Sequence, residues 1–290
     1  MNSNIQFIVS MIIFGTIGLV VRYIDLSASE TAFLSSLIGF LFLSLVFYKQ
    51  RRTFIWRTIR KNAFILVASG VALSGNWIFL YRSYEYTSLA NATLGYYFAP
   101  VFVMLLSPII LKEPLPLKKI LCMIIAIIGM TFIVGNGITA AGKNDVLGLI
   151  WGIAAAAFYA SLMLLNKFIK GINRLEVTII QLGTTASILL PYVLFTEGIT
   201  ILNVSVSSLP FILLLGIINT GVGFWLYFSS MENLKGQSIA MLSYIDPFVA
   251  ILISGFILRE PFTLLQMIGG ILLLSSTFVS EMRFHKYKSI

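Results

Sequence analysis

Ten apolar runs, each close to the length of a membrane-spanning helix, divide almost the whole sequence. A helix needs about 20 mostly apolar residues to cross the hydrocarbon core of a bilayer. The runs cover residues 5–24, 32–48, 64–82, 90–111, 117–136, 146–166, 176–196, 209–229, 238–258 and 262–280. The connections between them are short, so no soluble domain is inserted. We therefore predict an all-α integral membrane protein with ten transmembrane helices.

The composition excludes soluble classes of protein. Hydrophobic residues make up 58% of the 290 residues and charged residues 11%, whereas a soluble domain carries about 25% charged residues. A soluble core of this length could not bury so much apolar surface. The first run has no basic residue before it and no small-residue cleavage site after it, which predicts a retained helix rather than a signal peptide.

The single cysteine, Cys122, and the single histidine, His285, limit the chemistry. An intramolecular disulfide, a Cys-rich metal site and a His-based catalytic dyad are all excluded. The sequence also contains no phosphate-cradling loop and no metal-binding motif. We therefore expect neither a metal nor a cofactor, and transport driven by ATP would need a separate subunit.

Basic residues are distributed unevenly among the connections. If the chain starts inside, the inner connections and the tail hold 16 Lys and Arg residues and the outer connections hold 4. Because basic residues collect in cytoplasmic loops, both termini are predicted to be cytoplasmic, with residues 281–290 as a cytoplasmic tail. Six of these charges lie in residues 49–61. A short loop beside anionic lipid explains them more simply than a nucleic-acid surface does.

The two halves of the sequence resemble each other at an offset of 147 residues. Between residues 83 and 114, ten of 32 positions are identical to those 147 further on. The clearest block is Leu-Lys-Glu-Pro at 111–114, which corresponds to Leu-Arg-Glu-Pro at 258–261. Because each repeat has an odd number of runs, the second must enter the membrane from the opposite side. We predict two inverted five-helix repeats, over residues 5–136 and 146–280.

Inverted repeats are typical of secondary transporters, which bind their substrate near the middle of the membrane between the repeats. Pro100 and Pro247 occupy equivalent positions in the two repeats. Each removes one backbone donor, so we expect helix breaks at equivalent depth in the fourth and ninth helices. Broken helices mark the binding sites of many transporters.

The ten runs, the two repeats, the aromatic–glycine pair Phe14 and Gly15, and the Glu-Pro turns before the fifth and tenth runs resemble the EamA family of the drug/metabolite transporter superfamily. The resemblance covers residues 5–280. It implies a bacterial inner-membrane carrier, often an exporter of amino acids or other metabolites, with a cavity lined mainly by spans 1, 3, 4, 6, 8 and 9. The family often has an arginine early in the second span, where this chain has Ser35 and Ser36, so no role of that arginine carries over.

Asp246 is the only acidic residue well inside a predicted helix. An ionised side chain at a helix centre costs about 2.5–3.5 kcal/mol, so Asp246 should face a cavity or a partner. In one interpretation it binds a cation or carries a proton, and so couples transport. In the other it is the N-cap of a restarted helix whose first residue is Pro247. The two interpretations are compatible.

Polar and aromatic residues gather in the third, fourth, eighth and ninth runs. Pockets for organic ligands are mostly apolar and aromatic, with a few polar groups that fix orientation. The candidate cavity residues are Asn76, Trp77, Tyr97, Asn219, Tyr244 and Asp246. The alternatives are helix packing for the asparagines and an interface belt for the aromatics. The belt is the preferred interpretation for Tyr81, Tyr84 and Tyr86.

Three charged residues near outer helix ends, Arg22, Arg82 and Glu85, form a possible outer gate. The alternative is that such residues extend to the membrane interface. Glu113 and Glu260 precede prolines at tight turns and are assigned to structure. Small residues at steps of four between 148 and 160 predict close helix packing inside the fold, with a dimer face as the alternative.

The sequence therefore predicts a secondary transporter that moves a small metabolite by alternating access. An amino acid or related compound, exported, is the first choice, and the direction rests on the resemblance. The alternatives are uptake or exchange of another solute, such as a nucleotide-sugar-like compound, or an intramembrane enzyme or sensor. We expect a non-enzymatic protein of the inner (plasma) membrane whose partners are a small-molecule substrate and the lipid bilayer, not nucleic acid. It would act as a monomer or a homodimer.

Overall fold

The structure is a computed structural model that describes residues 2–51, 53–87, 89–134, 145–196, 198, 204–258 and 263–282. All regular secondary structure in these ranges is helical. The elements are α1 (Ser3–Gly15), α2 (Ile17–Val21), α3 (Ala28–Lys49), α4 (Trp56–Tyr86), α5 (Leu89–Tyr96), α6 (Ala99–Leu106), η1 (Ser107–Leu111), α7 (Leu117–Val134), α8 (Asp145–Asn166), α9 (Arg174–Thr196), η4 (Val206–Ser208), α10 (Leu209–Leu214), η5 (Leu215–Val222), α11 (Gly223–Met231), α12 (Gly236–Leu242), α13 (Ile245–Phe256) and α14 (Leu264–Glu281).

Within the described residues, seven helical segments are long and apolar enough to cross a membrane, and Ala99–Leu111 is a shorter apolar helix. Ten spans were predicted. Part of the difference has a simple cause, because the predicted fourth and ninth helices are interrupted. The chain leaves the helix at residues 97–98, between α5 and α6, and at residues 243–244, between α12 and α13. Neither pair forms one continuous helix.

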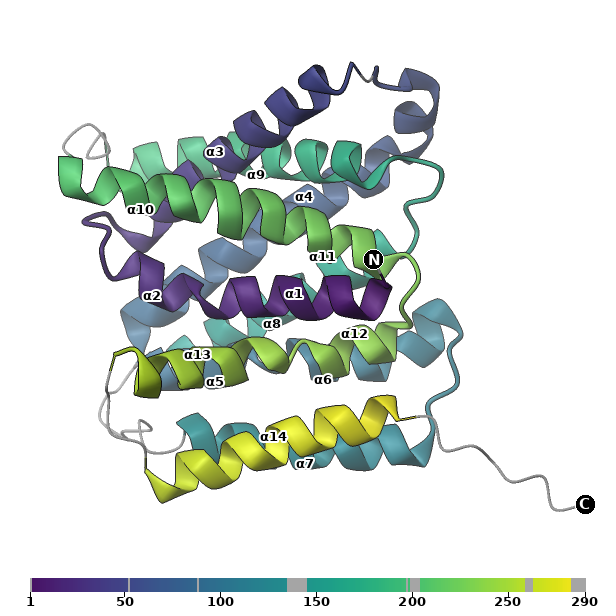
Figure 1. The fold of residues 1–290 in the computed structure, drawn as a ribbon, viewed down its shortest axis with the longest axis vertical. Helices are drawn as coiled ribbons and strands as arrows, with labels where there is room; N and C mark the ends of the chain where they lie inside the picture. Colours follow the sequence, from purple (N-terminus) through teal and green to yellow (C-terminus); the bar gives the residue numbers. More distant parts are fainter. Residues whose placement is uncertain are drawn as a thin grey trace, which may run out of the picture.

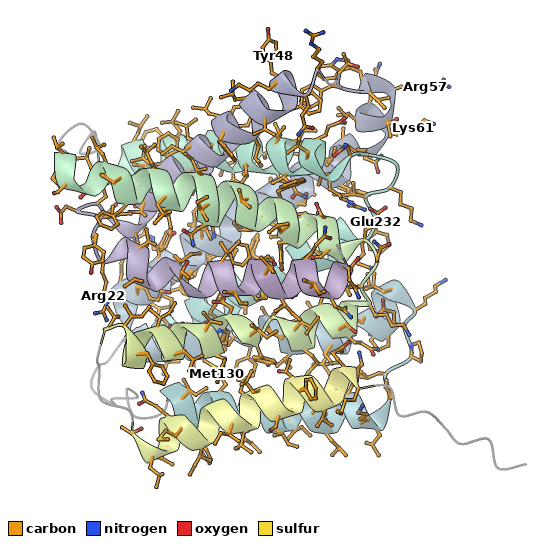
Figure 2. The ribbon with its side chains drawn as sticks, viewed as in Figure 1. Arg22, Tyr48, Arg57, Lys61, Met130 and Glu232 are labelled. Atoms are coloured by element: carbon orange, nitrogen blue, oxygen red, sulfur yellow. The ribbon has the colours of Figure 1, made fainter. Side chains whose placement is uncertain are left out.

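Most of the helices lie side by side with their axes roughly along one direction (Figure 1). α3 and α9 lie toward one edge of the molecule, and α7 and α14 form the opposite edge. α1 begins and α14 ends on the same side. Arg57, Lys61 and Glu232 lie on that side, which we call the basic end, and Arg22 lies on the other side, which we call the opposite end (Figure 2).

Glycine allows α7 and α14 to touch through their backbones. A Cβ atom at Gly269 would lie 2.5 Å from the carbonyl oxygen of Gly129, and a Cβ atom at Gly129 would lie 2.7 Å from that of Gly269. Both distances are too short for real contacts. Because the opposing atoms belong to the backbone, they can yield only if the two helices move apart.

We expect Gly269→Ala to lower the apparent melting temperature of the protein in detergent. Overpacking of this kind costs about 1–3 kcal/mol. The matched control is Gly18→Ala in α2, where an added Cβ atom meets nothing within 4 Å. The control should melt at or slightly above the wild-type temperature, because alanine favours the helix. Equal melting temperatures for the two variants would contradict the backbone contact.

Candidate functional site

Three interruptions of the helices lie near the centre of the molecule. Besides the breaks at residues 97–98 and 243–244, Thr16 separates α1 from α2. A Cβ atom on Gly15 would lie 3.0 Å from the carbonyl oxygen of Asp246, so the first break lies against α13. Tyr97 and Tyr244 line the same small cavity, which brings the other two breaks together.

Pro100 and Pro247 lie just after two of these breaks. Pro100 is the second residue of α6 and Pro247 is the third residue of α13. A first-turn proline costs no helical hydrogen bond, because the donor it lacks would have had no partner within the helix. The interpretation of Asp246 as an N-cap is wrong. The N-cap is Tyr244, which makes no side-chain capping bond, and Asp246 is the second helical residue.

The two candidate asparagines are buried and donate to backbone carbonyls of neighbouring helices. The Nδ2 atom of Asn76 is 2.9 Å from the carbonyl oxygen of Ala155 in α8. The Nδ2 atom of Asn219 is 2.7 Å from the carbonyl oxygen of Ile13 and 2.8 Å from the Oγ1 atom of Thr16. Asn219 thus bonds to groups at the break between α1 and α2. These bonds agree with the helix-packing alternative.

Asp246 lies at the start of α13, against the break after Gly15, and its carboxyl group is buried although the residue as a whole keeps some accessible surface. Among the described residues, this group has no hydrogen bond and no ion pair. The groups that interact with it electrostatically are tyrosine hydroxyls from four different helices. They belong to Tyr84 of α4, Tyr96 of α5, Tyr159 of α8 and Tyr227 of α11, together with Tyr97 beside α5.

The tyrosines form a stack beside Asp246. The ring centroids of Tyr96 and Tyr159 are 5.6 Å apart with an interplanar angle of 17°. Those of Tyr159 and Tyr227 are 6.2 Å apart at 14°. Phe14 packs edge-on against Tyr227, at 5.6 Å, and Trp77 packs against Phe224 on the same side. The arrangement combines one carboxyl group, several hydroxyls and flat apolar walls.

This centre is sealed toward the basic end. Phe7, Leu162 and Phe228, which lie in the halves of their helices nearest that end, are all 0% exposed. In contrast, Tyr84, Tyr96, Tyr97 and Tyr159 all keep some accessible surface. The closed side of the site is therefore the basic end.

Polar bonds fasten the connection between α11 and α12 at the basic end. The Nζ atom of Lys167 donates to the carbonyl oxygens of Met231, at 3.1 Å, and of Leu234. Arg174 donates from Nε to a carboxylate oxygen of Glu232, at 3.0 Å. We call these contacts, together with those of Glu113 described next, the basic-end clamp.

Glu113 completes the basic-end clamp. Its carboxylate accepts from the backbone N–H of Gly236 at 3.1 Å and of Gln237 at 3.5 Å, and so caps the start of α12. The side chain of Gln237 returns a bond of 2.8 Å to the carbonyl oxygen of Pro114. These contacts agree with the structural role predicted for Glu113. Glu260, for which the same role was predicted, and residues 283–290 lie outside the described residues.

Charge and burial set the pKa values in the clamp. Burial lowers the pKa of Lys167, and the nearby carboxylates of Glu113 and Glu232 oppose this shift. The hydrogen bond from Arg174 lowers the pKa of Glu232. A carboxylate with a lowered pKa stabilises the folded state at neutral pH, and this contribution is lost as the pH falls through the lowered value. Acidification should therefore weaken the Arg174–Glu232 contact.

The three residues of the predicted outer gate, Arg22, Arg82 and Glu85, are not part of the basic-end clamp. Arg22 is exposed at the opposite end. Arg82 and Glu85 pair with each other one helical turn apart, at 2.8 Å, and their side chains are 38% and 51% exposed. The small residues of α8 pack inside the fold, since a Cβ atom on Gly148 would lie 2.5 Å from Thr87 and one on Gly152 would lie 2.9 Å from the carbonyl oxygen of Ala92.

A second hollow in the structure has a different chemistry. A groove of about 870 Å³ lies between α3, α4 and α9, and its lining, which includes Phe33, Leu66 and Leu190, has no charged side chain. An uncharged apolar groove on the outer surface of a membrane bundle suits lipid chains better than a polar metabolite. The centre at Asp246 is therefore the candidate site.

The fold and this site define a helical membrane protein with interrupted helices around a central carboxyl group. The model of the EamA-like transporter family matches residues 1–135 and 146–282. A relative of Bacillus subtilis (strain 168), named uncharacterized transporter YxxF, is 32% identical over 86% of this chain and 79% of its own length. An uncharacterized transporter of Archaeoglobus fulgidus is 27% identical over 94% of each chain. The chain belongs to the EamA-like transporter family.

Solved structures agree on the fold. A crystal structure of a protein that is 16% identical covers 96% of this chain and 96% of its own, with a TM-score of 0.80. At that identity the likeness shows the fold alone. Together with the family match, it makes this chain a multi-span membrane transporter.

Proposed function

We propose that the chain is a secondary transporter that moves a small metabolite by alternating access around Asp246. The observation that carries the proposal is the unpaired carboxyl group of Asp246, placed where interrupted helices meet. Such interruptions in transporters free backbone groups and helix ends to contact substrates and ions. An ionisable residue inside a membrane is, by default, a candidate functional residue because of what its burial costs.

We further propose that ten helices form two inverted repeats, residues 5–136 and 146–280. Helix packing supports this arrangement. An exchange of the two halves converts the contact of α4 with α8 into that of α11 with α1, and the contact of α6 with α8 into that of α13 with α1. All four contacts are present. α3 with α9 and α7 with α14, which the exchange leaves unchanged, are also in contact.

Individual contacts repeat in the same way. A Cβ atom on Gly70 would lie 2.6 Å from Thr184, and one on Gly216 would lie 2.5 Å from Ile38. Both residues of one contact are 146 positions from their counterparts in the other. The bonds of Asn76 and Asn219 likewise join the third helix of each proposed repeat to the first helix of the other. A pseudo-two-fold arrangement explains both sets of contacts.

The remaining parts of the proposal follow from the charges and the family. The protein would lie in the inner (plasma) membrane with both termini in the cytoplasm, which makes the basic end the cytoplasmic side. It would export an amino acid or a related compound and would carry out no chemical conversion. Residues 281–290 would form a cytoplasmic tail, and the transporter would act as a monomer or a homodimer.

The test separates a carrier from an enzyme. A thermal-shift screen of metabolites on the purified protein identifies ligands, since a ligand that binds the folded state raises its apparent stability. We expect each hit to exchange across sealed proteoliposomes and to remain chemically unchanged in detergent. Conversion of a hit by the detergent-solubilised protein, with no exchange in proteoliposomes, would refute the proposal.

A further inference from the structure

The charge at the centre of the site is not balanced by the protein. Asp246 carries one negative charge when ionised, and the groups of the described residues that interact with it are all tyrosines. No basic side chain lies within α1, α2 or α14, the elements that pack on α13. Arg22, directly after α2, is exposed at the opposite end, and α14 carries a single acid, Glu281, at its far end. A buried charge without a partner is costly, so a bound cation would stabilise the site.

The groups around Asp246 are hydrogen-bond acceptors or apolar surfaces. A carboxylate only accepts, and a phenol oxygen accepts as well as donating. The side chains of Phe14, Trp77 and Phe224 add aromatic walls on the same side. A primary ammonium group has three N–H donors and one positive charge. It can therefore donate to the carboxylate and to two hydroxyls at once, and its charge balances that of the carboxylate. Aromatic rings also attract cations across their faces.

We propose that the Asp246–tyrosine site binds the primary ammonium group of a monovalent organic amine. The assignment rests on the proposed transport function and narrows its substrate class from an amino acid or related compound to a simple amine. The ammonium group lies between the carboxylate of Asp246 and the hydroxyls of Tyr96 and Tyr159, and the apolar body of the amine lies against the aromatic walls.

Charge balance favours a simple amine over an amino acid. A zwitterionic amino acid brings a carboxylate as well as an ammonium group. With Asp246 ionised, the occupied site then keeps a net charge of −1. That second carboxylate would need a positive charge to balance it, and the groups that interact with Asp246 offer only neutral tyrosine O–H donors and no basic side chain. A quaternary ammonium ion has the right charge but no donor for the hydroxyls.

Four related probes test these requirements. The probes are 2-phenylethylammonium, its neutral analogue 2-phenylethanol, its N,N,N-trimethyl derivative and L-phenylalanine, each at saturating concentration on the full-length protein in detergent. We expect the primary ammonium to raise the melting temperature most, by the linkage between binding and folding. The shift should persist in Asp25→Asn, which alters an exposed acid near the opposite end, and should be lost in Asp246→Asn.

A second pair of variants keeps the test decisive if Asp246→Asn does not fold. Tyr96→Phe removes one acceptor and should weaken the binding of the primary ammonium roughly fivefold, the effect of one lost hydrogen bond. Tyr48→Phe makes the same change at an exposed residue near the end of α3 and should leave affinity unchanged. Equal affinities in the two variants would overturn the proposed contact.

Other outcomes also decide the matter. Each shift is compared with that of the primary ammonium. An equal shift in melting temperature with the alcohol would overturn the role of charge, and an equal shift with the trimethyl compound would overturn the role of the hydrogen bonds. A larger shift with phenylalanine would overturn the charge-balance argument. The absence of any shift with the primary ammonium overturns the assignment. If another metabolite then exchanges across proteoliposomes, the transport function stands and only the substrate class falls.

Discussion

Asp246→Asn should give a folded protein whose transport no longer responds to a pH gradient. Asparagine has nearly the same shape as aspartate, but its side chain cannot bind and release a proton. The structure also removes the main reason to expect misfolding, because Asp246 is not the helix cap. Replacing an uncompensated carboxyl group with an amide should leave the melting temperature unchanged or raise it.

The measurement is the uptake of a screened ligand into proteoliposomes with and without an imposed pH gradient. We expect the gradient to accelerate transport at least tenfold in the wild type and in Asp25→Asn, and to have no effect in Asp246→Asn. The facing titratable groups are Tyr84, Tyr96, Tyr97, Tyr159 and Tyr227. Gradient-driven transport at the wild-type rate in Asp246→Asn would exclude coupling through this residue.

Lys167→Met should open the basic end. The Lys167 ammonium holds backbone carbonyls of residues 231–234, and a hydrogen bond to a charged group contributes about 1.5–3 kcal/mol. Because an opening of the basic end would move residues 231–234 away from Lys167, we expect the loss of these bonds to shift the equilibrium toward an open arrangement by roughly 10- to 150-fold. Methionine keeps much of the length and apolar volume of lysine but cannot donate.

A single cysteine reports this opening. Ser230 is 0% exposed and lies one residue before Met231, and Ser230→Cys changes only one atom. In a Cys122→Ala background, a membrane-impermeant maleimide added on the basic-end side should label Cys at position 230 at least tenfold faster when Lys167→Met is present. The control is Lys235→Met, which changes an exposed lysine of the same connection. Equal labelling rates in the two variants would show that Lys167 does not hold this end closed.

The sequence predicts the helical class well because apolar length is a local property. Each long run becomes helix, since backbone groups in a membrane must bond within their own segment. Prolines and the repeat offset also indicate where α5–α6 and α12–α13 are interrupted. The break at Thr16 and the π-helix η5 carry no such signal. They depend on tertiary contacts, such as the bond from Asn219 to the carbonyl oxygen of Ile13.

The site is less predictable because it depends on which side chains meet. Asp246 is recognisable as a rare intramembrane acid, but its tyrosine neighbours come from separate helices. Tyr84 was predicted to belong to an interface belt, whereas the structure brings its hydroxyl into electrostatic range of Asp246. Tyr159 was not among the candidates. The available signal was the repeat itself: in the sequence, Tyr159 and Ala160 of the sixth run occupy the place of Phe14 and Gly15 in the first run, and Phe14 contacts the same stack.

Lys167 illustrates a different limit of sequence reasoning. It was counted only as a basic residue of a cytoplasmic connection, and nothing in its local sequence distinguishes it from Lys170. Its role depends on the end of α11, more than 60 residues further along the chain, where the carbonyl oxygens lie. Charge counts therefore predict on which side of the membrane a connection lies, but not the hydrogen bonds that close that end of the protein.

The contact between Gly129 and Gly269 has a consequence for how this protein can evolve. Where side chains meet, a loss of volume on one helix can be compensated by a gain on the other. Here each glycine faces the backbone of its partner, so no second substitution can restore the fit. We therefore expect a substitution of either glycine to cost stability whatever residue stands opposite it, so that selection for stability acts on the two glycines as a pair.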